Sequence, residues 1–145
     1  MRVQEVMTRD VECIRPNESL QDAARRMKDL DVGSLPVCGE GDRLVGILTD
    51  RDIAIRAVAQ KRGPETPVRD IMSKEVLYCY EDDDVEDCAG NMGDQQVRRL
   101  PVLNRDKRLV GIVSLGDIAK KAEEEAGHAV AEITRPGGKH DQARH

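Results

Sequence analysis

Aromatic residues are nearly absent from this 145-residue chain, which has no Phe, no Trp and only two Tyr, Tyr78 and Tyr80. Its apolar core must therefore be built from Val, Ile, Leu, Met and Ala. Proteins that hold single-stranded nucleic acid stack the bases on aromatic side chains in a positive groove, whereas this chain has a net charge of −5. The composition argues against nucleic-acid binding, including a basic DNA-binding face.

Long apolar runs are also missing. No stretch approaches the roughly 20 apolar residues that a membrane helix needs, and the first ten residues lack the apolar segment of a secretory signal. The balance of 39% hydrophobic and 35% charged residues is typical of a globular protein. We therefore expect a cytoplasmic protein with no membrane partner.

The usual signatures of catalysis and of metal binding are absent as well. His occurs only beyond residue 127, so neither Ser nor Cys has a His near it in the repeated part of the chain, and no phosphate-binding or dinucleotide-binding glycine motif is present. The four cysteines match no zinc spacing, and the acidic run at residues 81–84 lacks the glycine of a calcium loop. The prediction is a protein that is not an enzyme, has no catalytic residues and no metal, and requires no cofactor.

What the sequence does contain is an internal repeat. Residues 3–57 align without a gap on residues 68–122, at an offset of 65 positions. Leu35-Pro36-Val37 falls on Leu100-Pro101-Val102, and Asp52-Ile53-Ala54 falls on Asp117-Ile118-Ala119. Units of this size bury little surface alone, so the two copies are expected to share a core.

Each copy predicts the order β-α-β-β-α. The first copy has apolar strands at 11–14, 35–38 and 44–48, an amphipathic helix at 20–30 capped by Ser19 with Asp22, and a helix from about 50 to 62. The second copy repeats this with strands at 76–79, 100–103 and 109–113. We expect units at 1–62 and 68–126, a linker at 63–67, and a C-terminal extension at 127–145 that is a flexible tail or a continuation of the helix.

The L-P-V strand and the motif G-I-x-[TS]-x-x-D-I, which begins at Gly46 in the first copy and at Gly111 in the second, resemble the CBS domain family. The tandem resembles a Bateman module, and also small stand-alone actinobacterial CBS-pair proteins of the hypoxic-response type. The resemblance implies a fold that mixes helices and strands, of the α/β (α+β) class. Its two units are related by a pseudo-two-fold axis and leave two clefts between them. It also implies a disc-like homodimer and an adenine nucleotide or related adenosyl ligand that regulates an unknown partner protein. AMP, ADP and ATP are the candidates, and NADH and S-adenosylmethionine are possible.

The family's ribose-binding aspartate corresponds to Asp52 and Asp117, each at the start of its last helix. Thr49 and Ser114, three residues earlier, correspond to a hydroxyl that faces the ligand. Asp, Ser and Thr at a helix start also serve as caps and complement the helix dipole. Both interpretations stay open at this point.

Arg98 and Arg99 precede the second L-P-V strand and match basic positions that reach phosphate in nucleotide-binding relatives, although solvent-exposed arginines are common. Gly33 and Ser34 stand at the equivalent positions of the first copy. Asp50, which replaces Leu115, adds negative charge near the first site. We therefore expect two unequal clefts, with the phosphate contacts in one of them.

Apolar and small residues of each copy would form the slot for the base, unless they are simply core. In the first copy we expect this slot to be lined by Thr8, Val11 and Ile47. In the second copy we expect it to be lined by Ser73, Val76 and Ile112.

Cys13 and Cys38 lie on strands that should be parallel neighbours, so a disulfide is conceivable if their Cα atoms come within about 7 Å. Reduced thiols are the alternative in a reducing compartment. A second functional hypothesis follows, in which a nucleotide-free CBS-pair dimer acts as a stress-response interaction protein with a thiol switch at these two residues.

Overall fold

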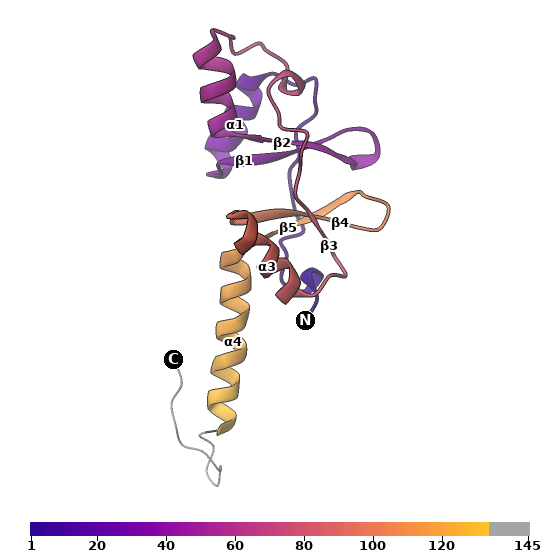
Figure 1. Ribbon diagram of the computed structural model, residues 1–145, viewed down its shortest axis with the longest axis vertical. Coiled ribbons are helices and arrows are strands. Elements are labelled where there is room, and N and C mark those ends of the chain that lie inside the picture. Colours follow the sequence, from indigo (N-terminus) through magenta and orange to yellow (C-terminus); the bar gives the residue numbers. More distant parts are fainter. Residues whose placement is uncertain (134–145) are drawn as a thin grey trace.

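The computed structural model describes the backbone of residues 1–133 and the side chains of residues 1–124, and it shows two stacked lobes (Figure 1). The first lobe contains α1 (Leu20–Leu30), β1 (Ser34–Cys38), β2 (Leu44–Thr49) and the short α2 (Asp50–Asp52). The second contains β3 (Cys79–Tyr80), α3 (Val85–Gln95), β4 (Arg99–Leu103), β5 (Leu109–Ser114) and α4 (Leu115–Ile133). The predicted mixed α/β fold is confirmed.

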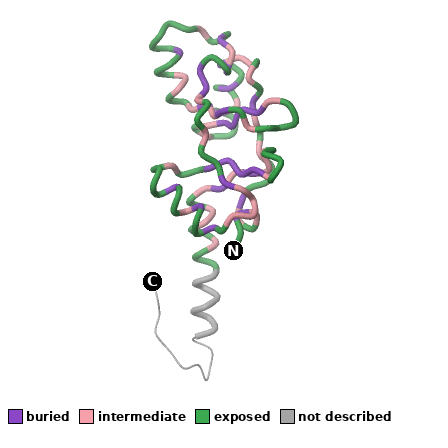
Figure 2. Tube along the Cα trace, turned by 45° about the vertical axis from the view of Figure 1, so that its right-hand side comes forward, coloured by how far each residue is buried: buried purple, intermediate pink, exposed green. Residues whose placement is uncertain are grey.

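The sheets of the two lobes follow the repeat. β1 and β2 pair antiparallel, and so do β4 and β5, each pair with a register shift near its hairpin end. β3 adds to the second sheet in parallel with β4, through Cys79 opposite Val102. Buried residues lie inside both lobes, while the hairpin turns are exposed (Figure 2).

The first helix of each lobe shows how far the two copies have diverged. In α1 the Asp22 N–H donates to Ser19 Oγ at 3.2 Å, which is the predicted cap, and Leu20, Ala23 and Met27 are buried. Ala24 and Leu30 are apolar and have helical spacing with these residues, but both are exposed. Asp84 stands at the start of α3, but its side chain accepts no capping hydrogen bond. The cap predicted for α1 therefore forms, and α3 has no equivalent side-chain cap.

The first strand of each unit is shorter than predicted. Residues 11–14 make a single parallel bridge, between Ile14 and Val37, and the strand predicted at 76–79 is reduced to β3, which begins only at Cys79. In the first unit, Val11 and Glu12 line the cleft described below.

The helix predicted from 50 to 62 is not a regular α-helix. After α2 the chain forms a π-helical turn at Ile53–Ala57 and a 3-10 turn at Val58–Gln60, and left-handed Lys61 (φ 62°) ends it before Gly63. The wider turn buries Ala57 and leaves Val58 68% exposed.

The last helix, by contrast, continues past the expected boundary at residue 126. α4 runs to Ile133, so residues 127–133 continue the helix. The rest of the predicted extension lies outside the described residues. No described helix is long and apolar enough to cross a membrane.

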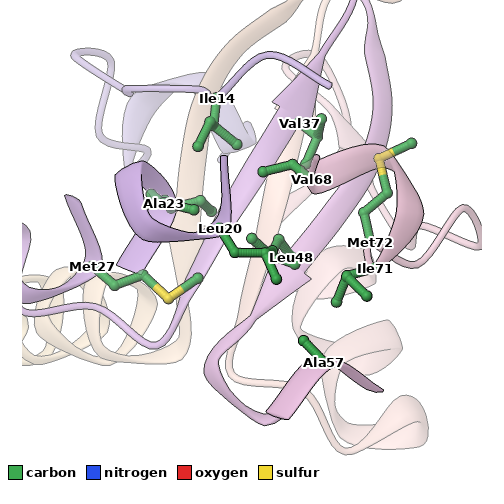
Figure 3. Packing of buried hydrophobic residues seen from close by; sticks show 11 residues of the cluster. Ile14, Leu20, Ala23, Met27, Val37, Leu48, Ala57, Val68, Ile71 and Met72 are labelled. Carbon is green, nitrogen blue, oxygen red and sulfur yellow. The ribbon is translucent and has the colours of Figure 1, made fainter. Parts of the chain in front are cut away.

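The two units exchange their first segments in space. Residues 1–8 lie in the second lobe, where Val3 and Met7 join its core and the Val3 N–H donates to the Asp83 carbonyl at 2.9 Å. Residues 66–73 lie in the first lobe, where Val68 joins the core with Ile71 and Met72 (Figure 3). Each lobe is therefore completed by chain from the other sequence unit.

Two equivalent glycines permit this exchange. A Cβ on Gly111 would lie 2.7 Å from Met7 Sδ and 2.8 Å from the Thr8 carbonyl oxygen, and one on Gly46 would meet Met72 Sδ and the Ser73 carbonyl oxygen at the same distances. Because real Cβ contacts are longer, only glycine lets the incoming segment pair with β2 or β5 at this separation.

Candidate ligand-binding cleft

A cleft of about 270 Å³ opens between the lobes. This volume is near the lower end of small-molecule sites, about 300 Å³. From the first sequence unit come the segment 8–12, the end of α1 and the start of β1; from the second come β4, β5 and the first turn of α4. Its lining comprises Thr8, Asp10, Val11, Glu12, Leu30, Val32, Ser34, Leu35, Pro36, Arg99, Ile112, Ser114 and Asp117.

The segment exchange determines which residues share this cleft. The Thr8 N–H donates to the Ile112 carbonyl at 2.8 Å, and the Ile112 N–H donates back to the Thr8 carbonyl at 2.9 Å. Ile47 and Ser73 exchange the same pair of hydrogen bonds, both at 2.9 Å. The predicted base slots were therefore wrong in their grouping: Thr8 belongs with Ile112 and Ser73 with Ile47, because each incoming segment pairs with the strand of the other unit.

Both predicted aspartates take part in capping boxes. The Asp117 N–H donates to Ser114 Oγ at 3.0 Å, and Asp117 Oδ2 accepts from the Ser114 N–H at 3.3 Å. Thr49 and Asp52 make the same reciprocal pair, at 2.9 and 3.0 Å. Capping and ligand binding are compatible, since the cap uses a single carboxylate oxygen and leaves the other for a ligand hydroxyl.

Only one of the two capping boxes faces this cleft. Ser114 and Asp117 line it, whereas Thr49 and Asp52 are not among its lining residues. Ser73 lines a separate hollow of about 370 Å³ with Arg56, Arg69 and Lys74. Ile47, Thr49, Asp52 and Val76 line neither of these two spaces.

The two predicted arginines also separate. Arg99 lines the cleft, whereas Arg98 does not, and the Arg98 carbonyl accepts from the Leu115 N–H at 2.9 Å. Ser34, the counterpart of Arg99 in the repeat, lines the same cleft. These two positions therefore do not mark separate clefts, as the repeat suggested, because the pseudo-two-fold relation brings β1 and β4 to one opening.

Seven lining residues were not expected from the sequence to contact a ligand. They come from the end of α1, the start of β1 and the positions that flank Val11: Asp10, Glu12, Leu30, Val32, Ser34, Leu35 and Pro36. The residues of β1 could have been found from the repeat. The equivalent strand β4 was already expected at a ligand site because it carries Arg99, and two-fold symmetry brings β1 to the same place. The acidic pair Asp10 and Glu12 carried no such signal.

All four cysteines are free thiols in the structure. The predicted pair lies close together, because burial and the neighbouring Cys13 thiol together raise the pKa of Cys38 to about 12. The structure thus brings the two residues together without a disulfide, and their oxidation stays a prediction. Within residues 1–124, no group of three or more His, Cys, Asp and Glu side chains converges as a metal site would require.

The sequence profile of the CBS domain matches residues 3–58 and 68–124. The chain belongs to the CBS domain family. This CBS pair is 42% identical over 134 residues to the CBS domain-containing protein YhcV of Bacillus subtilis, covering 91% of this chain and 94% of that protein. It is 36% identical over 132 residues to Hypoxic response protein 1 of Mycobacterium tuberculosis, covering 90% of each.

Solved structures of other CBS pairs share the fold. Hypoxic Response Protein I, crystallised with two coordinated zinc ions, superposes with a TM-score of 0.76 at 37% identity over 83% of this chain and 98% of that one. The CBS pair of MJ0100, in complex with 5′-methylthioadenosine and S-adenosyl-L-methionine, gives 0.74 at 29% identity over 86% and 98%. CBSX2 in complex with AMP gives 0.76 at 26% over 86% and 97%.

Proposed function

We propose that this CBS pair is a non-catalytic regulatory module that binds an adenosyl ligand in the cleft between its lobes. The observation that carries the proposal is the convergence of six predicted ligand residues on one cleft: Thr8, Val11, Arg99, Ile112, Ser114 and Asp117. The complexes of MJ0100 and CBSX2 support the ligand class, because their ligands share the adenosyl group.

The cleft offers a part for each portion of adenosine. Val11, Pro36 and Ile112 supply half-buried or buried apolar surface for the base. Asp117 keeps one carboxylate oxygen outside its cap, and that oxygen can accept hydrogen bonds from ribose hydroxyls. The first turn of α4 adds N–H groups at a helix start, which favour polar or anionic ligand atoms.

The charges of the lining side chains predict the order of affinity among the adenosyl ligands. Three carboxylates, those of Asp10, Glu12 and Asp117, face one guanidinium, that of Arg99. In residues 1–124 no ion pair within 4.0 Å joins Arg99 to any of the three. An excess of negative charge opposes a polyphosphate, so neutral 5′-methylthioadenosine and cationic S-adenosylmethionine should bind better than AMP, and AMP better than ADP or ATP.

Isothermal titration calorimetry with these five ligands and NADH tests the proposal. A ligand at 100 times its dissociation constant should also stabilise the protein by about 2.7 kcal/mol in a thermal melt. The double variant Asp10→Asn, Glu12→Gln should strengthen ATP binding by about three- to tenfold while changing 5′-methylthioadenosine little. Absence of binding by every adenosyl ligand overturns the function, whereas tighter binding of ATP than of AMP overturns only the ranking.

A second candidate is the nucleotide-free dimer acting as an interaction protein in a stress response. It is favoured by apolar side chains that remain exposed beyond α2, with Ile55 51% and Val58 68% exposed. A second copy covering this face would bury both residues, as expected for the disc-like homodimer of the family. Light scattering of the wild type and of Val58→Glu tests it: the wild type should be a dimer and the variant a monomer, and a monomeric wild type contradicts it.

A further inference from the structure

The second lobe buries two thiols that the cleft does not use. Cys79 in β3 and Cys88 in α3 lie with their Sγ atoms 3.3 Å apart. The two residues are 2% and 1% exposed, and they join the short edge strand to the helix that covers it. A disulfide has an S–S distance of about 2.05 Å, so a relative movement of little more than about 1 Å would allow the bond.

The fold itself does not require sulfur at these two positions. At the offset of 65, Cys79 corresponds to Ile14 and Cys88 to Ala23, and both of these are fully buried in the core of the first lobe. The same junction of strand and helix is thus packed by two aliphatic side chains in one copy and by two touching thiols in the other. The thiol pair is a property of this lobe rather than of the repeated architecture.

We propose that Cys79 and Cys88 form a peroxide-responsive dithiol, which closes to an intramolecular disulfide and clamps α3 to β3. The Cys88 thiolate attacks one oxygen of hydrogen peroxide, the O–O bond breaks, and the departing hydroxide takes a proton and leaves as water. The Cys79 sulfur then attacks the sulfur of the resulting sulfenic acid, the S–O bond breaks, and the hydroxyl leaves with the Cys79 proton as a second water. The two thiols lose two electrons, and the peroxide gains them.

The environment of the pair supports this order of events. The hydrogen bond between the thiols lowers the pKa of Cys88, since a Cys88 thiolate is stabilised by the Cys79 S–H, and the same bond together with burial raises the pKa of Cys79. Peroxide reaches the buried sulfurs through local opening, which the structure makes easy: α3 contains Gly90 and Gly93, and β3 is two residues long.

Peroxide treatment of the full chain, followed by alkylation of the remaining thiols and peptide mapping, tests the proposal. We expect a cross-linked peptide that joins Cys79 to Cys88, and a rise in the melting temperature of about 5 to 10 °C that dithiothreitol reverses. Cys88→Ala copies Ala23 of the first lobe and should abolish both effects. Cys13→Ala is the matched control and should keep both.

Two outcomes overturn the proposal. One is alkylation of both Cys79 and Cys88 after peroxide treatment of the wild type, a result that depends on no variant. The other is an equal rise in melting temperature for Cys88→Ala and wild type, which would assign the rise to Cys13 and Cys38.

Discussion

Replacing Gly46 or Gly111, the two glycines beside the exchanged segments, by alanine should strongly destabilise the protein. Only one of the two replacements should weaken ligand binding. In Gly111→Ala the new methyl group would lie 2.7 Å from Met7 Sδ and 2.8 Å from the Thr8 carbonyl oxygen, so the segment 1–8 must move. Overpacking of this kind costs about 1 to 3 kcal/mol. The two hydrogen bonds between Thr8 and Ile112 are worth about 1 kcal/mol each.

We therefore expect Gly111→Ala and Gly46→Ala each to lower the free energy of unfolding by about 2 to 4 kcal/mol, which for a chain of this size corresponds to a melting temperature lower by about 6 to 12 °C. Gly90→Ala is the control. A Cβ there meets nothing within 4 Å, so alanine should stabilise α3 by about 0.5 to 1 kcal/mol. Urea unfolding and calorimetry measure both quantities.

The two variants differ in what they displace. Gly111→Ala moves Thr8, a wall of the cleft, whereas Gly46→Ala moves Ser73, which lies outside it. Ligand affinity should fall at least about tenfold in the first and stay within about twofold in the second, a difference of about 1 kcal/mol or more. A Gly111→Ala protein as stable as Gly90→Ala would contradict the predicted clash with Met7 and Thr8. Equal loss of ligand affinity in Gly111→Ala and Gly46→Ala would contradict the assignment of Thr8 to the cleft.

Two further predictions concern single side chains. Asp117→Ala and Asp52→Ala each remove a cap and should each cost about 1 kcal/mol of stability, but titration calorimetry should show weaker adenosyl binding only for Asp117→Ala; equal weakening would contradict the assignment of the cleft. Arg105 hydrogen-bonds both carboxylate oxygens of Asp82 and holds the pKa of Asp82 below its ordinary value of 3.8. A depressed pKa stabilises the fold above the unfolded value and ceases to do so as the pH falls through the folded value, so Arg105→Ala should melt lower than wild type at neutral pH, and this difference should shrink as the pH falls below 3.8. A difference that does not shrink with falling pH would instead assign the effect to the Arg105 guanidinium carbon, which lies 4.0 Å from the centroid of the Tyr80 ring.

The repeat predicted the element order well, for a physical reason. Apolar periodicity and the Ser19 cap determine α1 locally, and the two L-P-V strands are short apolar runs next to turn-rich hairpins. The π-helical turn at Ile53–Ala57 was not predictable in this way, because regular helical spacing of apolar residues does not distinguish it from an α-helix. The short first strands were missed because pairing with a neighbour, not propensity, determines their length.

Six of the twelve ligand residues expected from the sequence line the cleft, and how they come together there was not predictable. An internal alignment identifies Asp52 with Asp117 and Ile47 with Ile112, and so it finds equivalent positions. The alignment does not reveal that the first segment of each unit packs in the lobe of the other unit. This exchange is the reason that Thr8 pairs with Ile112. The acidic character of the cleft was missed for the same reason, since Asp10 and Glu12 are distant in sequence from the strands and helix they meet.

Because the two units exchange their first segments, the smallest part of this protein that can fold with complete cores is the pair of units. A chain cut at residues 63–67 would give a first half without Val68 and Ile71 and a second half without Val3 and Met7, so each fragment would have a hole in its core and an apolar strip on its outside. Joining residue 3 to residue 83 also closes a long loop, which slows folding and delays completion of the second lobe until both ends of the repeat have been synthesised. A gene fusion that includes this fold must therefore carry both copies together, while either copy remains free to change its own cleft and core residues.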